Sequence, residues 1–314
     1  MEVRDIEALG PADRRALFER DAGVEAVRED VREIVGRVRD EGDVAVREFC
    51  REFDGVEVGN LDVTDAAERA HETVDDDLLE AIRTAADNVR AFHERQVPDD
   101  WRDDFGGREL GRRFRPLSQI GVYVPGGAAA YPSSALMGII PAKVAGVDHV
   151  VVTTPPADEL NPATLAAIHE AGADAVYSVG GAQAVAAMAY GTETVTAVEK
   201  VVGPGNRWVT AAKAQVRGDV EIDFLAGPSE VLVLADETAD PSYVAADLLA
   251  QAEHDDHASV VAVTADADLA EAVADELDGR LPDCDRQETV EAALDNDASG
   301  VFLARSMSEA VLFA

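Results

Sequence analysis

The sequence of 314 residues has very little lysine, and its acidic residues greatly outnumber its basic ones. Lys143, Lys200 and Lys213 are its three lysines, against 63 acidic residues, and the formal net charge is −36. The acids are spread through every segment, and arginine largely replaces lysine. Such a surface is typical of adaptation to a salt-rich cytosol, where screening acts over a few ångströms. It argues against a nucleic-acid phosphate backbone as a partner.

Cysteine and long apolar runs are also scarce. The two cysteines, Cys50 and Cys284, cannot form a disulfide framework and belong to no Cys-x-x-Cys pair, so we expect both to be inert. No apolar run reaches the roughly 18 residues that a membrane span needs. The charged N-terminus, MEVRDIEALG, lacks the apolar core of a signal peptide. We therefore expect a cytoplasmic protein that contacts no membrane.

The spacing of apolar residues predicts an α/β protein, and the length suggests two domains. Residues 1–115 are mainly helical by period; one stripe holds Val31, Ile34, Val35 and Val38 and is broken at Gly42. From Ile120, short β-branched runs alternate with alanine-rich helices, which indicates a parallel sheet covered by helices.

The domain boundaries that we expect follow from this change in the pattern of apolar residues. Residues 1–115 form a helical segment that contributes to a first α/β unit, and residues 116–228 form a central α/β domain. Residues 229–314 then return to the first unit. The final helix begins near Ser306 and stops at Ala314 in mid-stripe, with no glycine and no basic last turn. That ending is the pattern expected of an incomplete chain.

The dinucleotide fingerprint Gly-x-Gly-x-x-Gly is absent, but glycine turns follow three predicted strands. In a parallel sheet the carboxyl ends of the strands form the edge where ligands bind, and glycine lets backbone N–H groups approach phosphate. Any one of these turns could need glycine for its geometry alone. Together they predict a ligand site; they are Gly126-Gly127, Gly180-Gly181 and 203-GPGN-206, with Tyr123, Gln183 and Asn206 beside them.

The turn 227-GPSE-230 lies between the two α/β blocks, at a predicted hinge. Ser229 either caps this turn or contacts a substrate. Both alternatives stay open from the residues alone.

The run 248-LLAQAEHDDH-257 places Gln251, His254 and His257 in an otherwise apolar helix. Positions three apart share a helical face, so Gln251 and His254 should point the same way. They could be a polar pair satisfied within the fold, or part of a metal site. Gln-x-x-His is a weak metal signature, because glutamine seldom binds zinc and a catalytic zinc takes three protein ligands.

Five segments between Pro116 and Thr264 resemble the histidinol dehydrogenase family in order and spacing. They are QIGVYVPGG, VYSVGGAQAVAAMAYGTE, KVVGPGN, AGPSEVLVLAD and DLLAQAEH, with weaker similarity elsewhere, including REFDGV at 51–56. The pairing of GPSEVLV with LLxQAEH at this distance makes the resemblance highly specific.

The resemblance implies two Rossmann-like parallel-sheet units that lack the glycine fingerprint, in a homodimer whose sites draw on both subunits. It implies oxidation of L-histidinol to L-histidine through an aldehyde, with two NAD reductions and one zinc per site. Tyr123, Gln183 and Asn206 then match positions that contact NAD. Ser229, Gln251 and His254 match positions that contact histidinol, and Gln251 and His254 are also zinc ligands. His257 matches no ligand and is expected at the surface.

The resemblance also implies that the catalytic glutamate–histidine pair and the remaining aspartate and histidine zinc ligands lie beyond the position equivalent to Ala314. No catalytic acid or base is therefore expected in this chain. Two alternatives follow: a non-catalytic NAD-binding remnant of the enzyme, or a gene remnant whose product does not fold stably.

Overall fold

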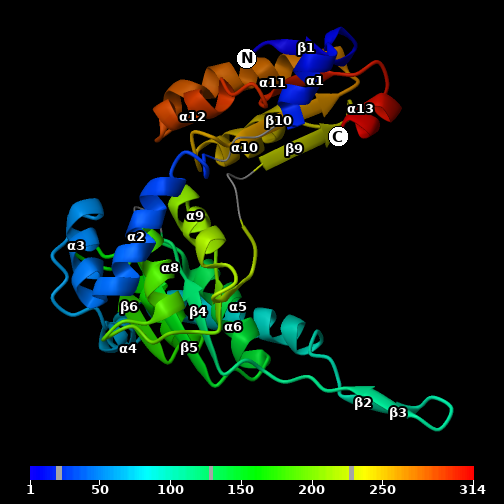
Figure 1. Cartoon of the computed structure of the whole chain (residues 1–314). Helices are drawn as coiled ribbons and strands as arrows, with labels where there is room; N and C mark the ends of the chain where they lie inside the picture. The colour runs from blue at the N-terminus through cyan, green and yellow to red at the C-terminus, as the bar shows by residue number, and fades with distance from the viewer. Residues whose placement is uncertain (19–22, 127–129, 226–229) are drawn as a thin grey trace. The chain divides into compact units, whose positions relative to one another are not determined.

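The computed structural model describes residues 1–18, 23–126, 130–225 and 230–314, and the chain divides into two compact units (Figure 1). The central unit is Val24–Ala226, and the terminal unit joins Met1–Gly23 to Gly227–Ala314. Each unit holds parallel strands covered by helices, so the predicted α/β class is confirmed. Among the helices of the described residues, none is both long and apolar enough to span a bilayer.

The central unit is built on a five-stranded parallel sheet with the order β6-β5-β4-β7-β8. Parallel strands buried on both faces have near-continuous apolar sequences, as in the run HVVVTT of β5. The strands are β4 (Gln119–Tyr123), β5 (His149–Thr154), β6 (Ala175–Ser178), β7 (Lys200–Val202) and β8 (Glu221–Ile222).

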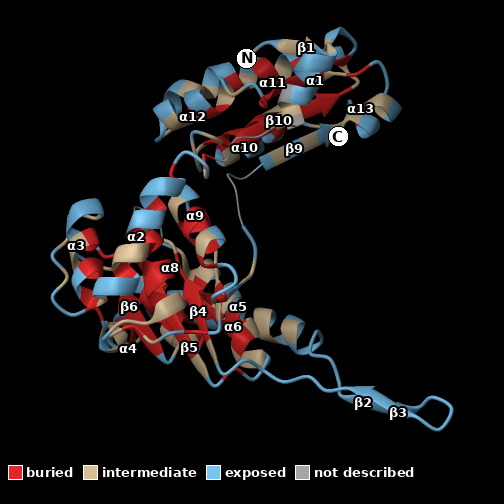
Figure 2. Ribbon diagram, viewed as in Figure 1, coloured by how far each residue is buried: buried red, intermediate tan, exposed pale blue. Residues whose placement is uncertain are grey.

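Helices cover both faces of this sheet and bury its core (Figure 2). One face carries α2 (Arg28–Glu41), α3 (Asp43–Phe53), α8 (Gly181–Tyr190) and α9 (Arg207–Val216). The other carries α4 (Thr64–Thr73), α5 (Asp76–Glu94), α6 (Pro132–Val144) and α7 (Pro162–Glu170). The predicted stripe of α2 is buried, and Gly42 ends that helix with a φ of 58°.

The division of the chain differs from the predicted one. The helices between residues 28 and 94 belong to the same compact unit as residues 116–226, because their apolar stripes pack on the central sheet. The first 23 residues do join the C-terminal part, since β1 (Val3–Asp5) pairs with β11 (Gly300–Leu303).

The terminal unit has a four-stranded parallel sheet, β1-β11-β10-β9, completed by β10 (Ser259–Thr264) and β9 (Glu230–Ala235). The helices α10 (Pro241–Ala252), α11 (Ala267–Arg280) and α12 (Gln287–Leu294) bury one face. The helices α1 (Pro11–Phe18) and α13 (Met307–Phe313) lie on the other, where Met307 and Phe313 pack on Phe302 and Val263. The helix α13 begins near Ser306, as predicted, and Ser306 caps it by accepting a hydrogen bond from the Glu309 N–H at 3.3 Å.

The chain order of the central strands creates a crevice. The chain runs from β4 to β5 and β6 in one direction, then returns to β7 and β8 on the other side of β4. In such sheets, ligands bind outside the carboxyl ends of the two strands where the direction changes. Here those strands are β4, which ends at Tyr123, and β7, which is followed by Gly203.

An antiparallel hairpin, β2 (Trp101–Asp104) and β3 (Glu109–Arg112), extends from the central unit (Figure 1). Every residue of both strands is exposed. The sequence analysis did not predict this hairpin.

Candidate functional site

Tyr123 ends β4, one of the two strands that flank the crevice inferred from the strand order, and its side chain is buried. Its hydroxyl oxygen accepts a hydrogen bond from the Gly181 N–H at 3.2 Å, which ties β4 to the start of α8. Burial raises the pKa of Tyr123 to about 12, although the Gly181 bond acts in the opposite direction. The hydroxyl therefore stays protonated at neutral pH and can donate a hydrogen bond.

Gln183 lies in the first turn of α8 and is 2% exposed. Gly181 has a φ of 61°, and a Cβ at that position would lie 2.7 Å from Gln183 Oε1. Glycine is therefore required both by the backbone conformation and by the close approach of the carboxamide. Because Gly181 also bonds Tyr123, the fold brings Tyr123 and Gln183 together, as the ligand-site hypothesis requires.

Asn206 is the N-cap of α9: its Oδ1 accepts hydrogen bonds from Trp208 N–H at 3.0 Å and Val209 N–H at 3.2 Å. Capping accounts for this oxygen, while the side chain is exposed and its amide nitrogen is left to donate. At the start of the same loop, a Cβ on Gly203 would lie 2.1 Å from Tyr123 O. The loop after β7 therefore packs directly on the end of β4.

The loop after β5 closes this edge of the sheet. A Cβ added to Gly126 would lie 3.1 Å from Pro155, and one added to Gly180 would lie 2.8 Å from it. The glycine turns after β4 and β6 thus pack against the first residue after β5, although Gly127 lies outside the described residues. A cavity of about 360 Å³ opens here, between Pro125, Thr154 and Asn161.

Asp54, which follows α3, is a residue that the sequence analysis missed. Burial raises the pKa of its carboxyl to about 6, and its charge in turn raises the pKa values of Tyr123 and Cys50. Its Oδ2 is buried and has no hydrogen-bond partner among the described residues. The only sequence signal was its place in the segment REFDGV. Burial raises the pKa of Cys50 to about 12, which keeps that thiol protonated.

Lys213 and Asp223 were also missed. They form an ion pair beside Gly203, at the base of the loop that carries Asn206, in which the lysine is buried and the aspartate is half-buried. A signal was available, because Lys213 is a rare lysine on an otherwise apolar and buried helix face.

A histidine–glutamate pair lies in the central unit, but at the opposite edge of the sheet. His71 Nε2 lies 2.7 Å from Glu170 Oε2, which also accepts from Arg83 Nε at 3.2 Å. Glu170 ends α7 just before β6 begins, so the pair marks the amino ends of the strands. It therefore lies away from the crevice and its glycine turns.

In the terminal unit, α10 ends at Ala252, earlier than expected, so Gln251 is in its last turn and His254 follows in a turn. The two residues stay adjacent because the His254 N–H bonds the Gln251 carbonyl at 3.2 Å. Gln251 is half-buried, and its Nε2 is buried without a hydrogen-bond partner in the part of the chain that the structure describes. The His254 side chain is exposed.

This pair can be tested as a metal site. The Gln251 carboxamide, whose Nε2 is buried and unsatisfied among the described residues, and the exposed His254 imidazole can offer one oxygen and one nitrogen ligand from a single turn. These donors fit zinc as part of a set of three. His257 is half-buried; its Nδ1 lies 2.6 Å from Asp256 Oδ1 and 3.5 Å from Asp255 Oδ1, so it is occupied by its neighbours. Ser229 lies outside the described residues.

Comparisons with known proteins agree with one another. A family model described as histidinol dehydrogenase matches residues 18–314. The histidinol dehydrogenase of Haloarcula marismortui is 73% identical over 314 residues, which are 100% of this chain and 74% of that protein. That of Bacillus subtilis is 47% identical over 313 residues, covering 98% and 73% of the two chains.

A solved structure shares the fold as well as the sequence. The crystal structure of histidinol dehydrogenase from Elizabethkingia anophelis matches with a TM-score of 0.86 and 34% identity, over 97% of this chain and 71% of that one. The resemblance carried by the five segments is confirmed, and the chain belongs to the histidinol dehydrogenase family.

Proposed function

We propose that this chain takes part in the oxidation of L-histidinol to L-histidine through histidinaldehyde, with two reductions of NAD, in cytoplasmic histidine biosynthesis. The observation that carries the proposal is the meeting of Tyr123, Gln183 and the Gly203–Asn206 loop at the crevice between β4 and β7. In a parallel sheet this is the position where a dinucleotide binds. Membership of the family supplies the substrate.

In this proposal the side chains at the crevice bind the cofactor by hydrogen bonds. Tyr123 contributes a hydroxyl proton, because its oxygen is already engaged by the Gly181 N–H. Gln183 contributes its carboxamide, and Asn206 contributes its amide nitrogen, because Oδ1 caps α9. The helices α8 and α9 begin at this edge, and helix N-termini favour the negative charge of a pyrophosphate.

We further propose that Gln251 and His254 contribute to holding a zinc ion, and that these two residues and Ser229 contact histidinol. Bound zinc would supply a template that orients the alcohol for hydride transfer. Gln251 supports this role because the Nε2 of its carboxamide is buried without a hydrogen-bond partner among the described residues, so nothing within them satisfies this group fully. The chain's own part is to present both donors from one turn.

We assign no described residue as the general base. The pair His71 and Glu170 has suitable chemistry, but it lies at the amino ends of the strands. This favours a second candidate function, a non-catalytic NAD-binding protein that keeps the crevice. We also propose a homodimer, on the strength of the family.

Turnover and binding separate the two candidates. The chain is supplied with zinc, NAD and L-histidinol over a range of salt concentrations, and NADH is followed by its absorbance while NAD binding is followed by calorimetry. Formation of NADH supports the dehydrogenase. Binding of NAD without NADH supports the second candidate, and a folded chain that does neither contradicts both.

Variants test the crevice itself. Tyr123→Phe and Gln183→Ala should each weaken NAD binding by about tenfold, the usual effect of losing one hydrogen bond to a bound ligand. The matched control is Tyr243→Phe, because Tyr243 is a 74% exposed tyrosine of the terminal unit. Unchanged NAD affinity in both crevice variants would contradict the assignment.

A further inference from the structure

Asp54 carries a carboxyl group that the proposed function leaves without a role. Its Oδ2 is buried and has no hydrogen-bond partner among the described residues. Most buried polar atoms of folded proteins have a partner, so an oxygen without one needs a specific explanation. The residue as a whole is half-buried, so the side chain is not sealed within the core.

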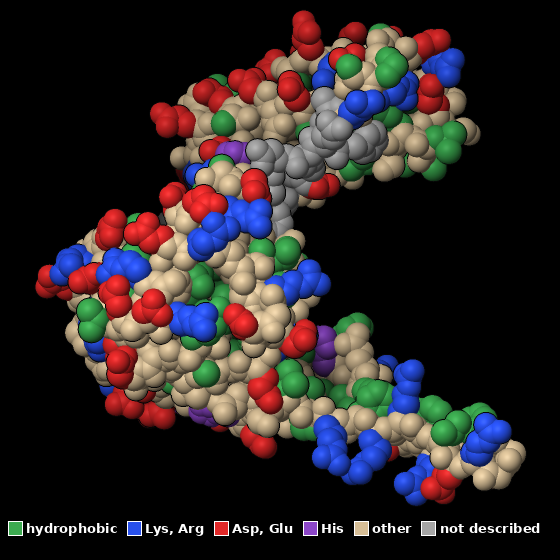
Figure 3. All heavy atoms as spheres, in the orientation of Figure 1, with side chains coloured by type: hydrophobic (Ala, Val, Ile, Leu, Met, Phe, Trp, Pro, Cys, Tyr) green, Lys and Arg blue, Asp and Glu red, His purple; other side chains and the backbone are tan. Residues whose placement is uncertain are grey.

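Burial, and not charge alone, distinguishes Asp54 from the other acids of the chain. Figure 3 shows Asp and Glu side chains over much of the visible face, as expected from a net charge of −36. Exposed carboxylates of this kind are solvated by water. Burial raises the pKa of Asp54 to about 6, and no cation among the described residues offsets that shift. An uncompensated buried carboxylate lowers stability, and such groups are concentrated at binding sites.

The backbone places Asp54 at the edge of the central sheet that carries the glycine turns. The Asp54 N–H closes the end of α3 by bonding the Cys50 carbonyl at 3.1 Å. The segment that follows reaches β6, where the Leu61 carbonyl accepts a hydrogen bond from the Ser178 N–H at 2.8 Å. Ser178 is the last residue of β6, and the turn Gly180-Gly181 comes directly before α8.

Two further observations place Asp54 beside the proposed cofactor site. Its charge contributes to the raised pKa of Tyr123, and an effect of this kind falls with distance. The ring of the preceding residue, Phe53, has its centroid 6.5 Å from that of Trp208, which lies in the first turn of α9. The Tyr123 hydroxyl in turn bonds the Gly181 N–H at 3.2 Å, at the start of α8. Asp54 is therefore near the N-terminal ends of both helices.

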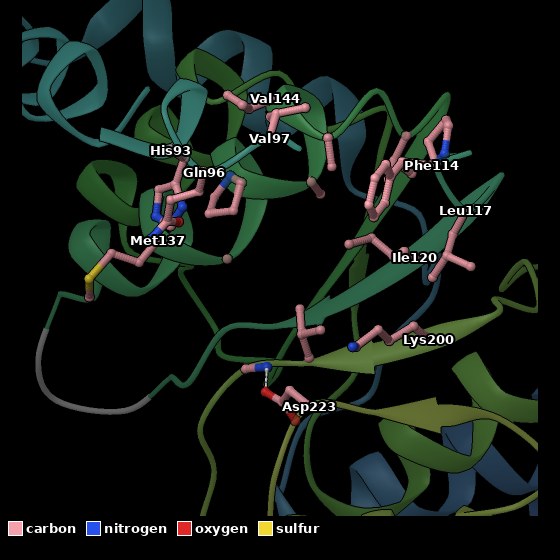
Figure 4. A pocket seen from close by; sticks show the side chains of 18 of the residues that line it. His93, Gln96, Val97, Phe114, Leu117, Ile120, Met137, Val144, Lys200 and Asp223 are labelled. Carbon is pink, nitrogen blue, oxygen red and sulfur yellow. Dashed lines mark hydrogen bonds between the residues drawn. The ribbon is translucent and has the colours of Figure 1, made fainter. Parts of the chain in front are cut away.

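Asp223 shows how a structural carboxylate is used at the same edge. It lines a groove of about 990 Å³, and its Oδ2 accepts a hydrogen bond from the Gly203 N–H at 2.8 Å (Figure 4). Its Oδ1 lies 2.7 Å from Lys213 Nζ. Both oxygens of Asp223 thus hold the loop after β7. Asp54 has no comparable cation among the described residues.

The position of the Asp54 carboxyl selects the group that it can bind. The N-terminal ends of α8 and α9 favour a pyrophosphate, and each phosphate of a dinucleotide is joined to a ribose. A carboxylate repels phosphate, but its two oxygens accept hydrogen bonds, and a ribose presents adjacent hydroxyl donors. In other dinucleotide-binding folds an acidic side chain binds a ribose hydroxyl from within the strand–helix repeat. Here the acid follows α3, a helix packed over the sheet.

We propose that Asp54 binds a ribose of NAD, with its carboxylate accepting hydrogen bonds from the ribose hydroxyl groups. The ribose supplies the partner that the carboxyl lacks among the described residues. The inference rests on the proposed NAD site and adds a charged binding residue to it. It needs neither zinc nor histidinol.

The first test measures NAD binding by calorimetry at pH 7 in high salt. Asp54→Asn keeps the shape of the side chain and removes its charge. It should weaken NAD binding at least about tenfold, because a hydrogen bond to a charged group is stronger than a neutral one. The matched control is Glu52→Gln, which removes the same charge from an exposed position of α3 and should bind NAD like the wild type. Equal affinity in Asp54→Asn and the wild type overturns the proposal.

Thermal unfolding without NAD separates a binding role from a structural one. Replacing a residue that only supports the fold lowers stability and affinity together. Asp54→Asn removes an uncompensated buried charge, so at pH 7 its melting temperature should be no lower than that of the wild type. Weaker NAD binding in a variant of undiminished stability supports the proposal. A variant that loses both stability and affinity shows that Asp54 is structural and overturns it.

The pH dependence of NAD affinity is a further readout. The ionised carboxylate is the stronger acceptor, so the wild type should bind NAD more tightly as the pH rises through 6. Between pH 7 and pH 5 the ionised fraction falls about tenfold, and affinity should fall by up to that factor. Tyr123 and Cys50 stay neutral in this range because their pKa values are about 12, and Arg47 stays charged. Asp54→Asn should lack this change, and identical profiles overturn the proposal.

Analogues of NAD identify the hydroxyl groups. The 2′-deoxy and 3′-deoxy forms at the adenosine ribose and at the nicotinamide ribose are each bound to the wild type and to Asp54→Asn, which completes a double-mutant cycle. An analogue that binds the wild type more weakly than NAD does, but binds the variant as NAD does, identifies the ribose that Asp54 contacts. An equal loss of affinity in both proteins for every analogue overturns the ribose assignment.

The outcomes separate this inference from the proposed function. A wild type that binds NAD and forms NADH, with Asp54→Asn unchanged in affinity, overturns the role of Asp54 and leaves the reaction standing. Binding of NAD that depends on Asp54, without formation of NADH, supports the inference and contradicts the dehydrogenase. A folded wild type that does not bind NAD overturns both.

Discussion

Lys213 Nζ lies 2.7 Å from Asp223 Oδ1, and Asp223 Oδ2 accepts a hydrogen bond from the Gly203 N–H at 2.8 Å. Lys213 also donates to the Gly203 carbonyl. The lysine side chain is only 3% exposed, and burial lowers its pKa even though Asp223 acts in the opposite direction. The pair thus holds both backbone groups of the residue that begins the Gly203–Asn206 loop.

Removing one member of this pair should destabilise the central unit. Lys213→Met leaves the Asp223 carboxylate without its cation, and breaking a buried pair costs about 3 kcal/mol. Chemical denaturation in high salt measures the loss, and the double variant Lys213→Met/Asp223→Asn should lose less than the sum of the two single variants.

Lys143→Met is the matched control, because Lys143 pairs with Asp174 where the two side chains are 28% and 35% exposed. It should cost less than about 1 kcal/mol. Equal losses for the two lysine variants would show that burial does not distinguish the pairs.

The close approach of Gly203 to Tyr123 predicts a large effect of one methyl group. Gly203→Ala places Cβ 2.1 Å from Tyr123 O at a φ of 113°. Gly218 has a φ of 111° with nothing within 4 Å of its Cβ position. The substitution Gly218→Ala therefore introduces backbone strain without a steric clash. Gly203→Ala should cost at least about 2 kcal/mol more than Gly218→Ala in thermal unfolding. It should also weaken NAD binding, which Gly218→Ala should leave unchanged.

The carboxyl of Asp54 predicts a pH-dependent difference. Its folded pKa is raised from 3.8 to about 6, so the folded chain binds this proton more tightly than the unfolded chain. Its contribution to the free energy of unfolding is therefore greatest below pH 3.8 and falls as the pH rises through 6. Asp54→Asn should stabilise the chain on the order of 1 kcal/mol above pH 6, after discounting for the half-buried position.

That gain should shrink as the pH falls through 6 and should disappear below 3.8, where the wild-type carboxyl is protonated in both the folded and the unfolded state. Denaturation curves of both proteins at several pH values provide the measurement. A constant difference at every pH would mean that the substitution acts through packing and not through ionisation.

The buried Nε2 of Gln251 predicts opposite effects on the metal-free and zinc-bound chain. Gln251→Leu removes an unsatisfied polar group, so without metal it should raise the stability by about 1 kcal/mol. Zinc should raise the melting temperature of the wild type but not of Gln251→Leu or His254→Ala. His257→Asn is the control and should respond like the wild type, because His257 is held by Asp255 and Asp256. An equal response to zinc in all four proteins would remove Gln251 and His254 as ligands.

Part of the fold could be predicted because spacing records which face of an element is apolar. The stripe of Val31, Ile34, Val35 and Val38 gave α2, and the β-branched runs from Ile120 onward gave the parallel strands. Spacing does not record which sheet an apolar face packs against. The helices between residues 28 and 94 were therefore predicted to belong to the first α/β unit, whereas they pack in the central unit. The hairpin was missed because its exposed strands lack a simple apolar–polar alternation.

The sequence alone determined the α/β class, the family and the edge of the sheet that carries Tyr123, Gln183 and Asn206, because motif order and strand–turn–helix spacing are local properties. Only the tertiary structure decided that the charge of Asp54 raises the pKa of Tyr123 and that Lys213 donates a hydrogen bond to the Gly203 carbonyl. It also decided that the carboxamide nitrogen of Gln251 has no hydrogen-bond partner among the described residues. The energy of a polar group depends on which distant segments exclude water from it, and that is settled when the chain packs.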